Sequence, residues 1–351
     1  MKNLAKVNSS RTFGIEIEFT TNGNTSQQEV ARRVNQAFRN VDVVMEGYNH
    51  NTRDHWKIIT DSTCGLELVS PILKGKKGLK EAQRVIDQLA SVDGVIVNRS
   101  CGIHVHVGCE DVTAQGMKNV LVQYTKNQEI INSILAPSRH DSRWCRPVYN
   151  GNVETLVHNL RNCDTVSSVI NTIGDRYRTV NVQCWNRYRT IEFRQHGGSV
   201  DSVKICNWVS FLLNTVDKAI ATTTPISTKI ANDPKKAFKQ CFGGSKVVLD
   251  FMLGRANHFG NTQYGTPVVN EVTPRWEAVC ELTAKIYHVC KWTNGSFTVQ
   301  IDFDNVNSNR KELLFLLGAE DTNQTTRQLG NKLFELGGLL NQVEQMGEQV
   351  A

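Results

Sequence analysis

Apolar and polar residues alternate strictly from Phe13 to Phe19. Because successive side chains of a β-strand point to opposite faces, this pattern predicts a strand with Phe and Ile on one face and Glu16 and Glu18 on the other. The two carboxylates would lie about 7 Å apart along one face. Like charges at that spacing repel each other, so the strand favours a cation over its polar face, although a solvated face is the simpler interpretation of an isolated Glu-x-Glu.

Three later segments repeat the alternation, one beginning at Glu67 and two at residues 101–108 and 190–196, and a shorter one begins at Val180. With the first strand they predict one shared polar face, which carries Glu16, Glu18, Glu67, His104, His106, Glu192, Arg194 and His196, with Asn181 and Asp61 nearby. A solvated face would instead be filled with Thr, Lys, Ser and Gln. Carboxylates and imidazoles that converge from distant segments suit hard divalent cations such as Mg²⁺ or Mn²⁺. Zinc fits less well, because the set is rich in carboxylates and no cysteine alternates onto the face.

The segments between these strands have apolar residues at helical spacing. They predict short strands at 41–48 and 56–60 and helices at 28–38, 78–91, 113–135, 152–160 and from about 201 to 216. A sheet with one apolar face and helices to cover it indicates an α+β fold.

The residue composition changes between Thr222 and Pro234, a stretch rich in Thr, Pro and Asn. We interpret this stretch as a linker or domain edge. We therefore predict a first domain at residues 10–225 and a mostly helical C-terminal region at residues 226–351. In that region the pattern predicts a strand at 296–303 and helices at 234–242, 246–253, 274–292 and 325–349.

Composition excludes several classes of protein. With 351 residues, 40% hydrophobic and 21% charged, the chain is typical of a soluble globular protein. The net charge of +6 favours an anionic ligand such as a nucleotide but is too small to indicate nucleic-acid binding. The start is not apolar and no run of about 18 apolar residues occurs, so we expect a cytoplasmic protein that does not span a membrane. The 10 cysteines include no Cys-x-x-Cys pair, so reduced thiols are expected.

Four motifs, in order and at similar spacing, resemble those of a known family over roughly residues 10–225. They are Gly14-Ile15-Glu16-Ile17-Glu18-Phe19, Asp61 to Glu67 leading into Ser70-Pro71, Gly102-Ile103-His104-Val105-His106-Val107-Gly108, and Asn181 followed by Thr190-Ile191-Glu192-Phe193-Arg194. On these motifs the chain resembles the carboxylate-amine ligases of the glutamine synthetase and glutamate-cysteine ligase superfamily, and most closely the putative amidoligase branch.

The resemblance implies a glutamine-synthetase-like antiparallel sheet of about six strands, with helices packed on one face and with ATP and metal ions on the other. Such enzymes phosphorylate a carboxylate with ATP and let an amine displace the phosphate, which gives an amide or isopeptide bond. The expected cofactors are therefore ATP and Mg²⁺ or Mn²⁺, and the expected partners are small-molecule or peptide carboxylate and amine substrates.

The resemblance also implies a role for each residue of the polar face. Glu16, Glu67 and Glu192 are expected to bind metal ions near the transferred phosphate, and Glu18 and His104 to bind or orient metal near the nucleotide phosphates. Arg194 is expected to stabilise the transferring phosphoryl group. Asn181 and His106 are expected to contact substrate, and Asp61 to receive the proton of the amine.

Two other functions are compatible with the same face. A phosphotransferase would phosphorylate a small metabolite without ligation. A catalytically inactive binding or structural protein would have kept the fold and lost the chemistry, although none of the acids on the face is replaced by a poor ligand. The region after about residue 225 has no counterpart in the resemblance, and we expect it to help select the substrate.

Overall fold

The computed structural model describes residues 9–267, except 37, 39, 40, 141 and 150, together with two strands at residues 287–293 and 296–301. Contacts within the chain divide it into two units, Met1–Pro267 and Val268–Ala351. The first unit contains every residue of the predicted polar face, and the second contributes an antiparallel pair of strands, β10 (Tyr287–Thr293) and β11 (Ser296–Ile301).

The first unit contains both helices and strands. In chain order they are β1 (Thr12–Thr21), α1 (Gln27–Gln36), β2 (Val43–Met45), β3 (Trp56–Asp61), β4 (Gly65–Val69), β5 (Leu73–Lys74), α2 (Gly75–Ala90), β6 (Val95–Ile96), β7 (Gly102–Gly108), α3 (Ala114–Lys126), α4 (Gln128–Asn132), the 3₁₀ helix η1 (Pro137–Arg139), α5 (Val153–Leu160), α6 (Val166–Ile173), β8 (Val180–Asn181), α7 (Trp185–Tyr188), β9 (Thr190–Gly197), α8 (Ser202–Ala221), α9 (Pro234–Phe242), α10 (Lys246–His258) and the 3₁₀ helix η2 (Thr262–Tyr264).

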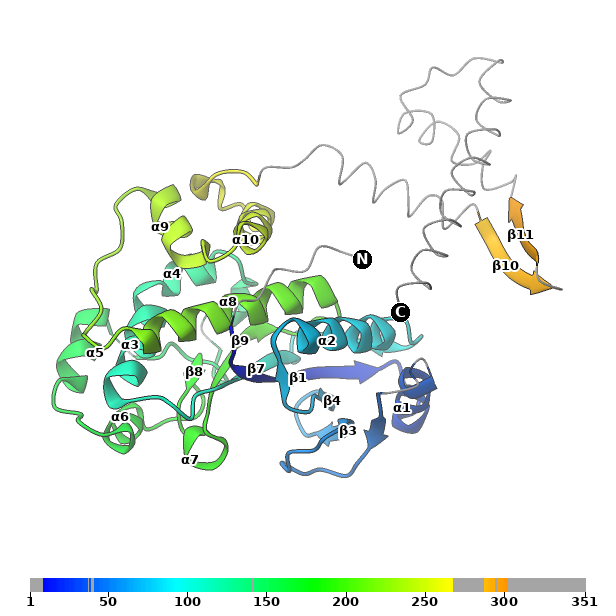
Figure 1. The fold of residues 1–351 in the computed structure, drawn as a ribbon, viewed down its shortest axis with the longest axis horizontal. Helices are drawn as coiled ribbons and strands as arrows, with labels where there is room; N and C mark the ends of the chain where they lie inside the picture. Colours follow the sequence, from blue (N-terminus) through cyan, green and yellow to red (C-terminus); the bar gives the residue numbers. More distant parts are fainter. Residues whose placement is uncertain are drawn as a thin grey trace, which may run out of the picture. The chain divides into compact units, whose positions relative to one another are not determined.

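Strand β1 is the centre of a nine-stranded sheet, as Figure 1 shows. The main path through the sheet runs β2-β3-β4-β1-β7-β9-β8, and the short strands β5 and β6 also pair with β1. Every pairing in this sheet is antiparallel except that of β2 with β3. The α+β class predicted from the sequence is confirmed as an open, mostly antiparallel sheet with helices, whereas its glutamine-synthetase-like character stays a prediction.

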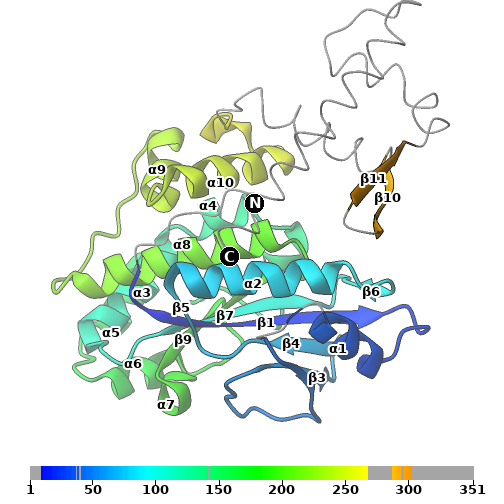
Figure 2. The same ribbon diagram turned by 45° about the vertical axis from the view of Figure 1, so that its right-hand side comes forward.

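The apolar face of the sheet is covered by helices. The alternating apolar residues of the central strands, such as Ile15, Ile17 and Val105, are fully buried in one continuous core with α2, α3 and α8. Figures 1 and 2 both show α2 and α8 side by side over the same face of the sheet. Burial of each side chain of this kind stabilises the fold by about 1.5–3 kcal/mol, so the residues that face the core are strongly determined. The residues between them must therefore point to the other face of the sheet.

Helices α9 and α10 belong to the first unit. The ring of Phe242 in α9 lies 4.7 Å from that of Phe211 in α8, between ring centroids, and α10 also packs on α8. The helices predicted at 234–242 and 246–253 are therefore confirmed, and α10 continues to His258. A domain boundary near residue 225 stays a prediction.

Two helix predictions are corrected by the structure. The helix predicted at 113–135 is divided into α3 and α4 at Asn127, whose side-chain amide donates a hydrogen bond to the carbonyl oxygen of Gln123 at 2.8 Å and so competes with the helical pattern. The helix predicted at 274–292 is wrong for residues 287–292, which lie in β10. That stretch is rich in aromatic and β-branched residues and finds a partner strand in β11.

Other sequence predictions are confirmed in part. The strand predicted at 296–303 is observed as β11, whereas residues 274–286 and the helix predicted at 325–349 lie outside the described residues. Helix α6 was not predicted, because its short apolar stripe spans only two turns.

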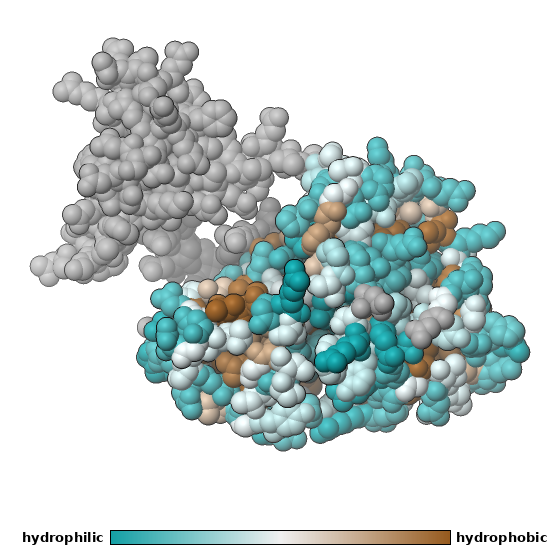
Figure 3. All heavy atoms as spheres, turned by 180° about the vertical axis from the view of Figure 1, so that it is seen from behind, coloured by the Kyte–Doolittle hydropathy of each residue, from teal (hydrophilic) through white to brown (hydrophobic). Residues whose placement is uncertain are grey.

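None of the helices in the described residues is long and apolar enough to cross a membrane. On the face shown in Figure 3, hydrophilic residues predominate and apolar residues form small separate patches. Scattered patches of this size are normal on a protein surface and indicate no particular binding site.

Candidate functional site

The polar face is assembled by the register between strands. Residues directly opposite each other on neighbouring strands include Glu18 and Glu67, Glu16 and His104, His106 and Glu192, and Asn181 and Glu192. These pairs come from β1, β4, β7, β8 and β9. The structure therefore brings the predicted acids and histidines of distant segments together on one face.

His104 is at the centre of this face. Its Nδ1 atom lies 3.1 Å from Oε2 of Glu16 and 3.7 Å from Oε1 of Glu192, and its Nε2 atom lies 3.7 Å from Oε1 of Glu18. Two groups of potential metal ligands share this histidine, Glu16–His104–Glu192 and Glu18–Glu67–His104, and within each group the ligand atoms lie within 4.8 Å of one another. His104, Glu18 and Glu192 are each less than 10% exposed.

The carboxylates on this face do not share one electrostatic environment. Burial raises the pKa of Glu67 well above its usual value, and the negative charges of Glu16 and Glu18 raise it further. For Glu16, burial also acts to raise the pKa, but His106 and His104 outweigh it and hold the pKa well below its usual value. Negative charge is therefore least well compensated at Glu67.

The residues present fit a hard divalent cation. Carboxylate oxygens with one imidazole nitrogen are the donor set that Mg²⁺ and Mn²⁺ accept, and a cation would relieve the repulsion around Glu67. No sulfur belongs to either group that contains His104. Glu16 and Glu192 would hold one such ion and Glu18 and Glu67 another, with the one unprotonated nitrogen of His104 as a ligand to either of them.

A β-bulge in β9 changes which side chains reach this face. Phe193 pairs with Val105 and His196 with Ile103, so two residues of β9, Arg194 and Gln195, oppose the single residue His104. The prediction that His196 shares the polar face is therefore wrong. His196 is buried on the helical side, where its ring lies 5.4 Å from that of Trp208 in α8, between centroids.

Arg194 remains on the polar face. Its Nη1 atom donates a hydrogen bond to Oε1 of Glu192, and its Nε atom donates one to the carbonyl oxygen of Trp144 at 3.4 Å. Burial tends to raise the pKa of Glu192, but the positive charges of Arg194, His106 and His104 together outweigh it and lower the pKa. Arg194 is therefore a fixed planar cation beside one of the two ligand groups.

A buried network of hydrogen bonds, which was not predicted from the sequence, holds the bulge. Gln195 is fully buried; its Oε1 atom accepts hydrogen bonds from the Tyr124 hydroxyl and from Gln128, both at 2.9 Å, and its amide donates to Asn132 at 2.6 Å. Arg139 of η1 donates to the carbonyl oxygens of Arg194 at 2.8 Å and of Gln195 at 3.2 Å. Arg139 lies 55 residues before the carbonyl of Arg194 that it binds, and no alternation pattern includes it.

The predicted substrate-facing residues lie at one end of the face. Asn181 donates to Oε2 of Glu192 at 2.6 Å, and Nδ1 of His106 lies 3.0 Å from the Thr190 hydroxyl. The ring of Tyr188 in α7 packs edge-on against His106, with 6.2 Å between ring centroids.

A loop between β2 and β3 reaches across to this end of the face. Tyr188 donates from its hydroxyl to the carbonyl oxygen of His50 at 2.8 Å. At the base of the loop, the buried ammonium of Lys57 donates to the Asn49 side chain at 2.7 Å and to the Asn51 carbonyl oxygen at 2.8 Å. The loop thus connects the β3 edge of the sheet to α7.

Asp61 lies at the opposite end, beside Glu18. Its Oδ1 atom accepts hydrogen bonds from the backbone N–H groups of Thr63 at 2.7 Å and Cys64 at 3.0 Å, which fixes the turn between β3 and β4. Asp61, Glu18 and Cys64 form a third group of potential ligand atoms within 4.8 Å of one another. The alternation of the sequence did not place Cys64 here, because it lies in the turn rather than in a strand.

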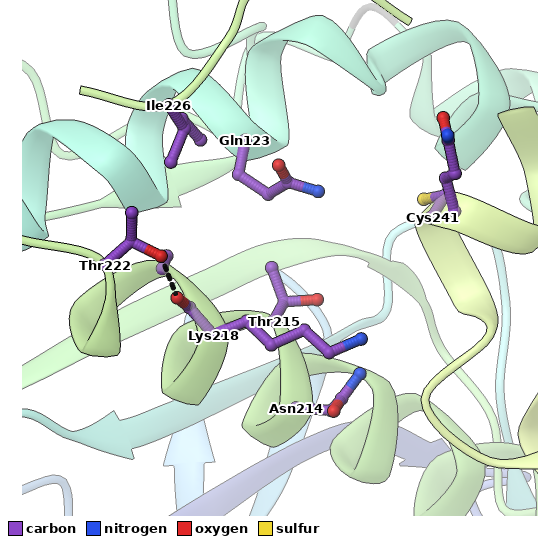
Figure 4. Close-up of a pocket in the computed structure, with 9 residues that line it drawn as sticks. Gln123, Asn214, Thr215, Lys218, Thr222, Ile226 and Cys241 are labelled. Atoms are coloured by element: carbon purple, nitrogen blue, oxygen red, sulfur yellow. Dashed lines mark hydrogen bonds between the residues drawn. The ribbon is translucent and has the colours of Figure 1, made fainter. Parts of the chain in front are cut away.

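A separate pocket lies on the helical side of the sheet, away from this face. Figure 4 shows it between α3, α8 and α9, lined by residues such as Gln123, Asn214 and Lys218. Its lining contains no carboxylate and none of the predicted site residues. The polar face, rather than this pocket, is therefore the candidate functional site.

No curated protein matches the sequence of this chain. The family model described as putative amidoligase enzyme matches residues 9–216, which include all the residues of the polar face. Because this match covers more than half of the 351 residues, the chain belongs to the family of putative amidoligase enzymes, which are enzymes of the ligase kind.

Proposed function

We propose that the chain is an ATP- and Mg²⁺-dependent carboxylate-amine ligase that forms an amide or isopeptide bond through an acyl-phosphate intermediate. The observation that carries the proposal is the convergence of Glu16, Glu18, Glu67 and Glu192 on one histidine, His104, in a member of the amidoligase family. Four carboxylates in two overlapping ligand groups are more than one isolated cation needs, and they match the pair of metal ions common in phosphoryl-transfer sites.

The reaction needs an activated carboxylate, because oxide is a poor leaving group and amines do not displace it. A carboxylate oxygen attacks the γ-phosphorus of ATP and ADP leaves; the amine then attacks the acyl carbon and inorganic phosphate leaves. When bound, Mg²⁺ neutralises the phosphates and holds donor and acceptor in line.

The chain's own residues supply the fixed geometry. The sheet register and hydrogen bonds hold the acids, so they need little rearrangement during the reaction. Arg194, held by Glu192 and by the Trp144 carbonyl, would stabilise charge on the transferring phosphoryl group. His106 and Asn181 would contact substrate. Asp61 uses its Oδ1 atom to hold the turn, and its second carboxylate oxygen would receive the proton of the amine.

The test is to incubate the pure protein with ATP, Mg²⁺ and pools of carboxylates and amines, and to follow both ADP release and the mass of new products. We expect ADP and a product whose mass equals carboxylate plus amine minus water. Glu192→Gln should remain folded and release no ADP, whereas the exposed control Glu110→Gln should match the wild-type protein.

The other outcomes separate the rival functions. ADP with a phosphorylated product and no amide would identify a phosphotransferase, and no ADP with any pool would favour an inactive binding protein. We further propose that residues 226–351 help to select the acceptor. Chains ending at residue 225 should then bind Mg²⁺·ATP but ligate poorly.

A further inference from the structure

Two aromatic residues lie at the edge of the polar face, next to Arg194. The carbonyl oxygen of Trp144 accepts a hydrogen bond from Nε of Arg194 at 3.4 Å, and the ring of Trp144 packs edge-on against that of Tyr177, with 5.5 Å between ring centroids. Tyr177 leads into β8 through Thr179, whose carbonyl oxygen accepts a hydrogen bond from the backbone N–H of Arg194 at 3.0 Å. Both aromatic residues are therefore held beside the strand that carries Glu192 and Arg194. Trp144 is nevertheless 38% exposed, which is unusual for so large an apolar side chain.

A guanidinium group stacks on each of the two rings. Cζ of Arg143 lies 4.6 Å from the ring centroid of Trp144, and Cζ of Arg176 lies 5.3 Å from that of Tyr177. Both arginines are exposed, and in the part of the chain that the structure describes neither has a carboxylate within ion-pair distance. A guanidinium that stacks on a ring still presents the N–H groups at its edge, so each of these arginines can bind an anion.

The neighbouring charges leave this region positive. Arg146 and Arg178 lie opposite each other in a parallel bridge that joins the two segments. They share the carboxylate of Asp175, which forms an ion pair with Arg146 and has an oxygen 3.5 Å from Nε of Arg178. Among the described residues of these segments, one carboxylate thus accompanies four arginines, and the charges of Arg143 and Arg176 are not compensated.

We propose that the arginine–aromatic cluster, which comprises Arg143, Trp144, Arg176 and Tyr177, binds the acidic side chains of a peptide substrate whose reacting carboxylate lies beside Arg194. The two oxygens of a carboxylate match the parallel N–H groups of a guanidinium. Because the cluster adjoins Arg194, an extended peptide that places one carboxylate at the metal ions brings neighbouring acidic residues to the cluster. The inference rests on the proposed ligase function for the statement that the bound peptide is a substrate, whereas binding itself does not require catalysis.

An acidic peptide fits this cluster better than a nucleic acid does. Single-stranded nucleic acids bind by stacking their bases on aromatic faces, but here guanidinium groups lie over the rings of Trp144 and Tyr177, and the two rings pack against each other. The net charge of +6 is also small for a protein that binds nucleic acid. The proposed reaction needs a carboxylate substrate, and an acidic peptide carries several carboxylates.

The experiment measures binding of a fluorescent oligoglutamate peptide to the full chain by fluorescence anisotropy, at constant ionic strength and with excess Mg²⁺. An oligoglutamine peptide of equal length and a labelled oligothymidylate are the comparison ligands. The double variant Arg143→Gln/Arg176→Gln removes both stacked guanidinium groups, and the control Arg32→Gln/Arg33→Gln removes the same charge from two exposed arginines of α1. All four positions are exposed, so both variants should fold. We expect oligoglutamate to bind the wild type and the control equally and the Arg143→Gln/Arg176→Gln variant about tenfold or more weakly, and oligoglutamine to bind none of them measurably.

Equal affinity for oligoglutamate in the wild type and in Arg143→Gln/Arg176→Gln would overturn the inference, as would a wild-type protein that does not bind oligoglutamate. Tighter binding of oligothymidylate through the same two arginines would overturn it in favour of a nucleic acid. A protein that binds oligoglutamate through both arginines but forms no amide would uphold the peptide site and refute the ligase function. Amide formation on glutamate peptides with the same KM in the double variant as in the wild type would do the reverse, so the two failures are distinguishable.

Discussion

The clearest test of the metal binding proposed for the polar face is Glu67→Gln. Glu67 lies opposite Glu18 in the register of β1 and β4, and ligand atoms of Glu67, Glu18 and His104 lie within 4.8 Å of one another. Burial, with Glu16 and Glu18 next, raises its pKa well above the usual value. The glutamine keeps the shape of the side chain and removes its charge.

The size of the effect follows from the distance between the carboxylates. At 4.8 Å and an effective dielectric constant of about 20, two unit charges repel each other by about 3 kcal/mol. His104 and partial protonation of Glu67 offset part of this, so we expect metal-free Glu67→Gln to be more stable than the wild type by about 1–2 kcal/mol, or about 4 °C.

The direction of this stability difference agrees with the raised pKa of Glu67. An acid whose pKa is raised in the folded state, here above 4.5, makes the folded protein lose stability as pH rises from that value towards its folded pKa. Above both values the wild-type protein carries the full repulsion, which the glutamine variant lacks. The difference between the two proteins should therefore be small in acid and largest at neutral pH and above.

The assay is thermal unfolding with a chelator and with excess Mg²⁺. In chelator, Glu67→Gln should melt higher than the wild type. At about 100 times its dissociation constant, Mg²⁺ should stabilise the wild type by about 2.7 kcal/mol and the variant much less, so the order reverses. The exposed control Glu110→Gln should follow the wild type in both conditions. A metal-free Glu67→Gln that melts below the wild type would refute the reasoning.

Three further predictions follow from the same structure. Arg194→Lys keeps the charge but loses the planar fork, so kcat for ADP release should fall by about 10²-fold with little change in KM for ATP; an unchanged kcat would mean that Arg194 only pairs with Glu192. Burial lowers the pKa of His196 to about 3, below the value of 6.5 expected when unfolded, so stability to urea should fall by about 1.4 kcal/mol per unit of pH below 6.5, and His196→Gln should lose that slope. Residues 1–267 expressed alone should fold, since contacts group them in one unit; an insoluble fragment would argue against that grouping.

Strand alternation was enough to predict most of the polar face, because a period of two is a local property. Ile15 and Ile17 are fully buried in the core, which forces Glu16 and Glu18 to the other side. The same holds for His104 and His106 between Ile103, Val105 and Val107. The prediction required no knowledge of which strands are neighbours.

Alternation failed at His196 because a bulge inserts one residue into the pattern. The residues from Thr190 to His196 do not predict a bulge, because Arg194 and Gln195 both fit the pattern of a regular strand. It depends on partners outside the strand, including Tyr124 and the side chain of Arg139. The pattern within one segment cannot predict contacts with residues that are distant in the sequence.

The bulge also explains why the face carries two arginines with different roles. It turns Gln195 away from the face, into the buried network with Tyr124, and it leaves two consecutive carbonyl groups to be bound by Arg139. Arg194 is thereby left to pair with Glu192, while Arg139 is held next to Gly102, whose N–H donates to Glu18. The two adjacent carbonyl groups that bind Arg139 are those of the two residues at the bulge, so the bulge lets one strand hold both Arg194 beside Glu192 and Arg139 beside Gly102.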